Sequence, residues 1–239
     1  MKNKKSTKKE VVAVIKTHKL FSHMFLLSLV SVSVFGTTIQ SFESGTVSPG
    51  STSLALMGCP NPGLTGEGTY SIGGSSSTCH SLWASVGPQA GSNYMIVNGS
   101  TSPGMVYQQT VNITLGLNST FGGYFTGLYL ASPATLQLRV FNGTAALGSP
   151  AAQLQFVTSV NPPAPSPLWA LQTLSFVPTG TQVTVQVYNA TGFASGNDFG
   201  IDSLDVTQFG AAVISSTPEP ASFVLAGTAL LALAMRRKV

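Results

Sequence analysis

Few residues in the middle of this chain could do acid-base or metal chemistry. Between residues 37 and 217 the single basic residue is Arg139, and the five acids are Glu43, Glu67, Asp198, Asp202 and Asp205. A glycosidase needs two carboxyl groups flanking the bond that it cleaves. Three of the five acids fall in one strand-like segment near residue 200, which favours a structural role for them. Hydrolysis by a carboxylate pair is therefore weakly supported.

A nucleophilic site is also weakly supported. A Ser-His-acid arrangement needs a histidine base, and His80 is the only histidine after residue 23. It lies beside Cys79 in a Gly- and Ser-rich segment that carries no nucleophile-elbow motif. One His and two Cys are also fewer ligands than the usual four of a structural zinc site. We expect a protein that is not an enzyme, with a secreted hydrolase as the least favoured alternative.

The first 36 residues have the pattern of a secretory signal peptide. Seven lysines precede residue 20, and an apolar run from Leu20 to Phe35 follows them. Val34 and Gly36 suit the minus-three and minus-one positions of a cut, so we expect cleavage after Gly36. An uncleaved signal anchor is the alternative.

The last residues predict a short membrane anchor. Pro218 and Pro220 stop a helix from running through them, because each lacks an amide donor. Residues 221–235 carry no charge and would rise about 22 Å as a helix, somewhat less than a hydrocarbon core of about 30 Å. We expect a linker over 211–220 and a transmembrane helix within 221–239. The basic end favours a cytoplasmic C-terminus; it consists of Arg236, Arg237 and Lys238.

This order of Pro218-Glu219-Pro220, apolar span and basic end resembles the C-terminal sorting signal of PEP-CTERM proteins, which exosortases process in envelope-forming bacteria. The resemblance implies contact with an exosortase and the membrane during sorting, followed by delivery to the cell surface or an exopolysaccharide matrix. Residues 37–217 have a formal charge of −4, so the exported part has no basic patch for nucleic acid. We expect no nucleic-acid partner.

Cys59 and Cys79 are the only cysteines. An exported compartment favours pairing them, and the loop that the bond closes would contribute about 3 kcal/mol in the chain-entropy description. We expect a disulfide.

The central region reads as β-strands. Apolar residues alternate with polar ones from Met105 to Leu115, from Leu136 to Val140, at Leu154 and Phe156, and from Val183 to Val187. Gly and Pro clusters separate these segments. In the last strand Phe199 and Ile201 share one parity but Leu204 and Val206 share the other, which predicts a β-bulge at Asp202-Ser203. We expect an all-β domain over 37–210 made of two antiparallel sheets.

That last strand, the early Phe42-Glu43-Ser44-Gly45 and the mid-chain Trp169 resemble the galactose-binding-like jelly rolls of carbohydrate-binding modules. The Gly- and Ser-rich stretch from Thr46 to Ser81 departs from a compact module of this type. The resemblance implies a jelly-roll sandwich and a structural Ca²⁺ held by Glu43 and Asp202 with Asp205, which suits the preference of Ca²⁺ for oxygen ligands. The alternative is that these acids are solvated or cap turns.

The same resemblance suggests sugar stacking on aromatic side chains, although most aromatic residues of a sandwich lie in the core. Tyr188 and Phe141 lie on the polar parity of their strands and are the preferred candidates. We therefore expect a non-catalytic surface protein that binds exopolysaccharide. The alternative is a structural or adhesive protein that binds other proteins or itself.

Overall fold

The computed structural model describes residues 32–48, 50–59, 63–129, 131–159, 169–193 and 196–211. Within these ranges the chain forms eleven strands and one 3-10 helix, η1, at Ser76–Thr78. The strands are β1 Val32–Gln40, β2 Ala55–Leu56, β3 Thr69–Gly73, β4 Tyr94–Asn98, β5 Gly104–Asn112, β6 Asn118–Gly127, β7 Thr135–Asn142, β8 Ala152–Val157, β9 Ala170–Phe176, β10 Gln182–Asn189 and β11 Phe199–Ala211.

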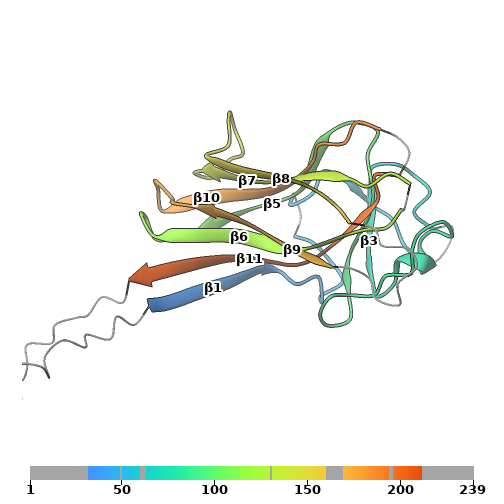
Figure 1. Ribbon diagram of the computed structural model, residues 1–239, viewed down its shortest axis with the longest axis horizontal. Coiled ribbons are helices and arrows are strands. Elements are labelled where there is room, and N and C mark those ends of the chain that lie inside the picture. The colour runs from blue at the N-terminus through green and yellow to red at the C-terminus, as the bar shows by residue number, and fades with distance from the viewer. Residues whose placement is uncertain are drawn as a thin grey trace, which may run out of the picture. The chain divides into compact units, whose positions relative to one another are not determined.

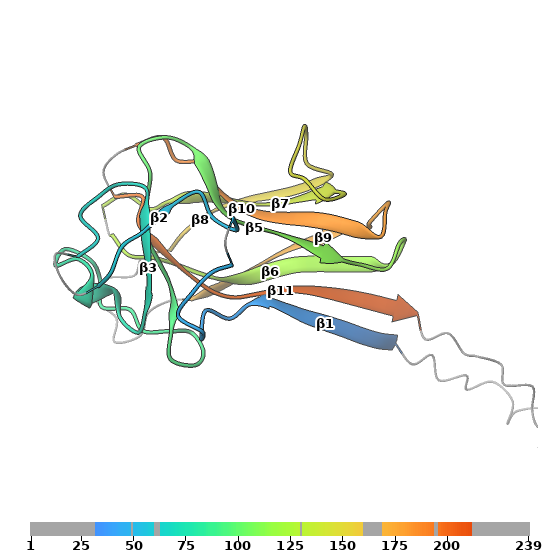
Figure 2. The same cartoon turned by 180° about the vertical axis from the view of Figure 1, so that it is seen from behind.

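The strands form two sheets that pack face to face (Figures 1 and 2). The larger sheet has the order β2-β3-β4-β11-β6-β9, with β1 also paired to β11, and the smaller sheet has the order β5-β10-β7-β8. All pairings within the smaller sheet are antiparallel, while β2 and β3 run parallel. The predicted all-β, two-sheet sandwich is confirmed.

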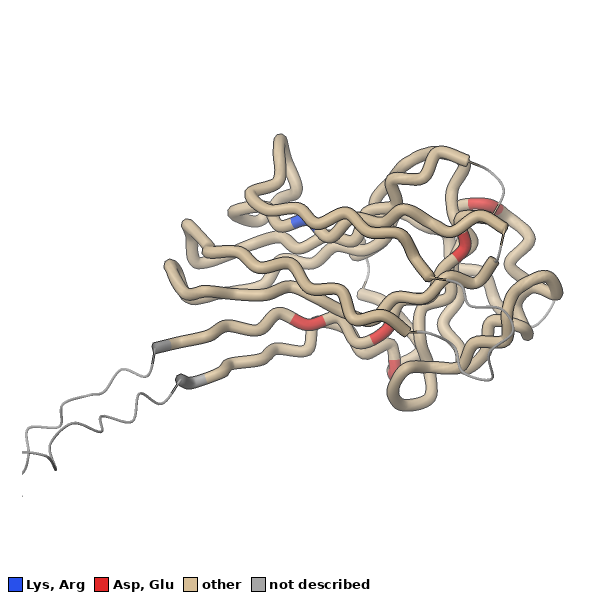
Figure 3. The backbone as a smooth tube through the Cα atoms, in the orientation of Figure 1, with Lys and Arg blue, Asp and Glu red and all other residues tan. Residues whose placement is uncertain are grey.

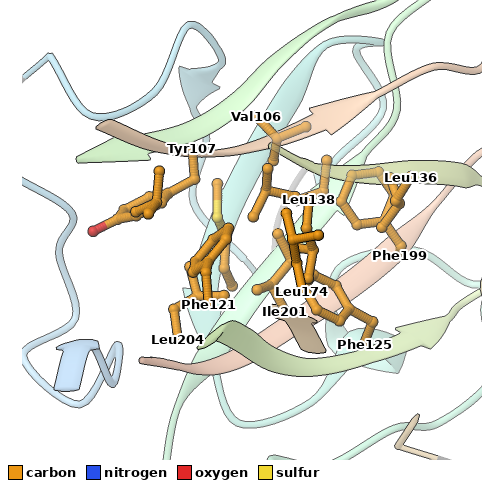
Figure 4. Packing of buried hydrophobic residues seen from close by; sticks show 14 of the residues in the cluster. Val106, Tyr107, Phe121, Phe125, Leu136, Leu138, Leu174, Phe199, Ile201 and Leu204 are labelled. Carbon is orange, nitrogen blue, oxygen red and sulfur yellow. The ribbon is translucent and has the colours of Figure 1, made fainter. Parts of the chain in front are cut away.

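The main core fills the space between the two sheets (Figure 4). Phe121 and Phe125 of β6 and Phe199 of β11 meet Leu136 and Leu138 of β7, and each of the five side chains is at most 1 % exposed. Every second residue of these strands points to the same face, so period-two apolar patterning places them all inside.

The predicted bulge in β11 is confirmed. Asp202 pairs with Tyr124 and Asp205 pairs with Gly122, so β11 has one residue more than β6 between these pairs. Ser203 takes up the extra residue at a positive φ of 52°. The shift returns Leu204 and Val206 to the core beside Phe199 and Ile201.

The parity prediction for Met105 to Leu115 needs correction at its ends. A register shift in the β5–β10 pairing lies where Val187 pairs with Tyr107 and Tyr188 with Met105, so both Val106 and Tyr107 are buried. Leu115 lies beyond the end of β5 and is 56 % exposed. A bulge changes the parity of a strand, and the alternation alone does not reveal where it begins.

A second, smaller core packs the long insertion, residues Thr46 to Ser81, against the larger sheet. Tyr94 and Ile96 of β4 point away from the main core and contact Leu64, Trp83 and Leu128. The Tyr94 ring also packs edge-on against Trp169, with ring centroids 5.2 Å apart. A disulfide joins Cys59 to Cys79 within the insertion. The insertion is therefore held against the larger sheet by its own cluster of buried apolar side chains.

The predicted signal peptide, linker and membrane anchor lie mostly outside the described residues. The sandwich forms a compact unit from Val34 to Gly210. The predicted cut after Gly36 falls inside β1, where Val34 and Phe35 are 59 % and 62 % exposed. The lysine-rich leader and the anchor expected within 221–239 lie outside the described residues. Among the residues that are described, no helix is long and apolar enough to span a membrane.

Candidate functional site

A pocket of about 270 Å³ lies among the loops at one end of the sandwich, where β4 and β6 end and β11 begins. We call it the loop-end pocket. Acidic positions gather in this loop region and along β11, whereas the one Lys or Arg of the described residues lies in the smaller sheet (Figure 3). The pocket is lined by Thr65, Glu67, His80, Leu82, Trp83, Asn98, Tyr129, Gly196 and Asp198.

Asp198, directly before β11, organises the floor of the loop-end pocket. Its side chain is 6 % exposed, and its Oδ2 accepts a hydrogen bond of 2.8 Å from Nε1 of Trp83. Its Oδ1 accepts one of 3.2 Å from the amide of Gly99. Burial raises the pKa of the Asp198 carboxyl, and these two hydrogen bonds act in the opposite direction.

The neighbouring Asn197 ties further loops to the same point. Its Nδ2 donates to the carbonyl oxygens of Ser100 and Phe193 at 2.8 and 2.9 Å. The backbone of Asp198 also accepts the amide of Leu128 at 2.9 Å, and Leu128 accepts the amide of Ala84 at 2.9 Å. Loops that are distant in sequence therefore converge on the start of β11.

His80 and Trp83 form one wall of the loop-end pocket. Their rings are tilted by 32° with centroids 5.1 Å apart. Nδ1 of His80 accepts the amide of Leu82 at 3.2 Å. A backbone amide can only donate, so Nδ1 is the acceptor in this contact. Leu82 itself is 67 % exposed at the rim.

Glu67 and Tyr129 complete the rim of the loop-end pocket. Burial and the nearby charge of Asp198 raise the pKa of Glu67, although most of the Glu67 side chain remains in solvent. Tyr129 is half-buried and packs against Gly196, which has a φ of +85°. A Cβ at position 196 would lie 2.4 Å from Cδ1 of Tyr129. Glycine at this position lets the tyrosine ring close one side of the pocket.

The loop-end pocket thus combines two carboxylates, an amide and an imidazole with aromatic and aliphatic walls. Carboxylates accept strong hydrogen bonds from hydroxyl and ammonium groups. Most of the residues that line the pocket carry polar groups, which suits a ligand rich in hydroxyl groups better than an apolar one. The volume is slightly below the roughly 300 Å³ at which drug-sized sites begin, so it suits a group about the size of one sugar ring.

The acids predicted to hold calcium lie elsewhere and accept backbone amides. Oδ2 of Asp202 accepts the amides of Gln89 and Ala90 at 2.9 and 3.1 Å, and the Glu43 carboxylate accepts those of Ser92 and Asn93. Glu43 and Asp202 therefore hold one loop from two sides. Asp205 accepts a hydrogen bond from Thr207 instead.

This arrangement resembles the capping alternative more than a metal site. Within the described ranges, no group of three or more His, Cys, Asp or Glu side chains is placed to hold a metal ion. The carboxylate oxygens of Glu43 and Asp202 are already directed at N–H donors, which a cation would have to displace. The calcium site stays a prediction.

The two predicted sugar-stacking residues lie on the outer face of the smaller sheet. Phe141 is only 4 % exposed and offers no free ring face. Tyr188 is half-buried, and the Arg139 guanidinium lies 3.5 Å from the centre of its ring. Arg139 also donates to Gln137 and Gln186. Further bonds from Gln137 to Gln155 and from Gln186 to Gln108 extend this network across all four strands.

The loop-end pocket was not predicted from the sequence. The sequence favours a structural role for Asp198, as for the other acids near residue 200, and it does not single out Trp83. A usable signal was the Gly-Asn-Asp directly before a buried strand, because polar residues there must find partners in neighbouring loops. Glu67 lies in an insertion without periodicity, and no pattern marked it.

Comparison with protein families assigns the C-terminal end. Residues 216–238 match the family described as PEP-CTERM protein-sorting motif. The match covers all six predicted sorting residues: Pro218, Glu219, Pro220, Arg236, Arg237 and Lys238. Comparison with curated proteins gives no match.

Among solved structures, the C-terminal sugar-binding domain of EclA has a TM-score of 0.34 and 19% identity, and the match covers 43% of this chain and 66% of that one. A xylan-binding domain of carbohydrate-binding module family 22 from Paenibacillus barcinonensis has a TM-score of 0.38 and 13% identity, covering 77% and 100%. A Stig cyclase from Fischerella sp. TAU has a TM-score of 0.45 and 12% identity, covering 73% and 98%. At these values the likenesses carry no argument about function.

The sorting motif and its position settle the destination of the chain. Proteins with this motif are exported, are anchored transiently in the membrane by the C-terminus, and reach the cell surface after exosortase processing. The chain is an exported surface protein with a C-terminal PEP-CTERM sorting motif.

Proposed function

We propose that this surface protein binds polysaccharide without cleaving it, and that the loop-end pocket holds one sugar unit. The observation that carries the proposal is the composition of the pocket. Glu67, Asp198 and Asn98 can pair with hydroxyl groups, while Leu82 and Tyr129 offer apolar surface for the C–H face of a pyranose ring.

Binding fits the pocket better than hydrolysis. Asp198 already accepts hydrogen bonds at both oxygens, from Trp83 and Gly99. A general acid or base must instead exchange its proton with substrate or water. Asp198 is thus placed to orient loops and to accept from a ligand through its remaining lone pairs. These contacts support a recognition role for the pocket.

The location of the protein supports the same role. A surface protein sorted by exosortase meets extracellular polysaccharide, and residues 37–217 have a formal charge of −4 with Arg139 as the one basic residue. Strongly anionic polymers are poor candidates because two carboxylates and no Lys or Arg line the loop-end pocket. The proposal therefore covers neutral or positively charged glycans.

The test is binding of the full-length chain, purified in detergent, to an array of polysaccharides. Tyr129→Ala is expected to weaken binding about tenfold or more, in line with the loss of an aromatic contact. Tyr188→Ala removes a tyrosine from the sheet face and serves as the matched control. Loss of binding in Tyr188→Ala alone would move the site to the sheet face, and absence of any glycan binding would refute the proposal. Release of reducing sugar would refute its non-catalytic part.

A further inference from the structure

The charge of the loop-end pocket indicates which sugar it would select. Two carboxylates line it, those of Glu67 and Asp198. Arg139, the one Lys or Arg within the described ranges, contacts Gln137, Gln186 and Tyr188 in the smaller sheet. His80 also lines the pocket, and its charge acts to lower the pKa of the Asp198 carboxyl, against the larger effect of burial. No Lys or Arg is among the residues that line the pocket, so the two carboxylates have no permanently charged protein cation beside them.

Both carboxylates keep acceptor capacity for a ligand. Each oxygen of Asp198 accepts one hydrogen bond from the protein and has a second lone pair. Glu67 lies at the solvent-exposed rim. Burial, together with the Asp198 charge in the case of Glu67, raises the pKa of both carboxyl groups, and a positive ligand group would relieve the repulsion between them.

The walls of the pocket suit an organic cation better than a metal ion. Ca²⁺ takes six to eight oxygen ligands, whereas an ammonium group needs only about three acceptors. Trp83 and Tyr129 lie beside the carboxylates, and aromatic rings attract a cation that approaches their faces. Leu82 adds aliphatic surface that would contact the ring carbons of a sugar.

We propose that the loop-end pocket selects an amino sugar with a free, protonated amine. This rests on the proposed function and makes it more specific. The amine would lie between Glu67 and Asp198, and the pyranose ring would lie against Tyr129 and Leu82. An N-acetylated sugar has no positive charge and would bring no cation to the two carboxylates.

The test compares matched glycans on the full-length chain. An array of N-acetylated polysaccharides of several linkages is probed before and after chemical removal of the acetyl groups, with pentalysine as a peptide cation. The deacetylated form is expected to bind roughly three- to tenfold more tightly at low salt, and the preference should shrink at about 1 M salt. Glu67→Gln should remove most of the preference, whereas Asp205→Asn, the same change of charge outside the pocket, should keep it.

The outcomes separate the two proposals. Equal binding of both forms through Tyr129 would overturn the amino-sugar inference and leave the proposed function standing. Binding to neither form would overturn both proposals. If pentalysine competes as well as the deacetylated glycan, the pocket selects cationic peptides, and the amino-sugar inference is overturned.

Discussion

The indole nitrogen of Trp83 donates a 2.8 Å hydrogen bond to the buried carboxylate of Asp198, which lies 115 residues further along the chain. This contact joins the segment that follows η1 to the residue directly before β11. It connects the fold to the proposed site, because the loops that line the loop-end pocket meet there.

Removing the indole donor is expected to cost more stability at Trp83 than at Trp169. Trp83→Phe leaves a buried carboxylate short of a donor, which costs about 2–3 kcal/mol beyond the smaller ring. Trp169→Phe removes a bond to the neutral carbonyl of Gly87 and should lose about 1 kcal/mol on the same basis. Urea unfolding measures both losses. Equal losses would contradict the role given to Asp198, as would an unchanged Trp83→Phe effect in the Asp198→Asn background.

Acid conditions are expected to stabilise the sandwich. Burial raises the pKa of Asp198 and Asp202 above the ordinary value of 3.8, and burial with the Asp198 charge raises that of Glu67. A carboxyl with a higher pKa in the folded chain binds its proton more tightly there. Its stabilising effect is complete below the unfolded value and is lost as the pH rises through the folded value.

The free energy of unfolding should therefore fall as pH rises from about 4 through these raised values. Urea unfolding at a series of pH values measures the slope. Asp198→Asn and Asp202→Asn should each flatten it, while Asp205→Asn controls for the loss of one acid. A stability that rises over this interval and is unaffected by the variants would contradict the assignment.

Gly99→Ala is expected to destabilise the chain by about 3 kcal/mol or more. A Cβ at this position would lie 1.3 Å from Oδ1 of Asn197 and 2.4 Å from the Asn197 carbonyl oxygen. Gly104→Ala is the control, because the nearest atom to its Cβ would be 3.9 Å away. Thermal unfolding compares the two variants. A mild effect at position 99 would mean that the Asn197 anchor can move without cost.

The disulfide is expected to support the pocket as well as the fold. Cys59 and Cys79 close a loop of sequence separation 20, and losing that constraint costs about 3 kcal/mol. Glu67 lies inside this loop and His80 directly follows it, so the Cys59→Ser/Cys79→Ser variant should also lose glycan affinity. Reductant should lower the free energy of unfolding of the unsubstituted protein but not that of this variant. Unchanged unfolding after reduction would contradict the structural role.

More of the fold than of the candidate site could be predicted from the sequence, and the reason is physical. Alternation in β7, β10 and β11 reports burial on one face of a sheet, and it located even the bulge at Asp202-Ser203. The loop-end pocket depends on contacts such as Trp83–Asp198 between segments distant in sequence, which leave no periodic pattern. Phe141 followed the correct parity, yet the structure leaves it only 4 % exposed, because parity assigns a face and does not report what covers it.

Hydrogen exchange with a bound glycan tests directly whether the loop-end pocket is the glycan-binding site. The full-length chain is compared with and without a saturating polysaccharide from the array. We expect slower amide exchange in the segments that line the pocket, 64–68, 80–83, 98–99, 128–129 and 196–198, with little change in β7 and β10. Protection confined to β7 and β10, or glycan binding without protection of the pocket segments, would contradict it.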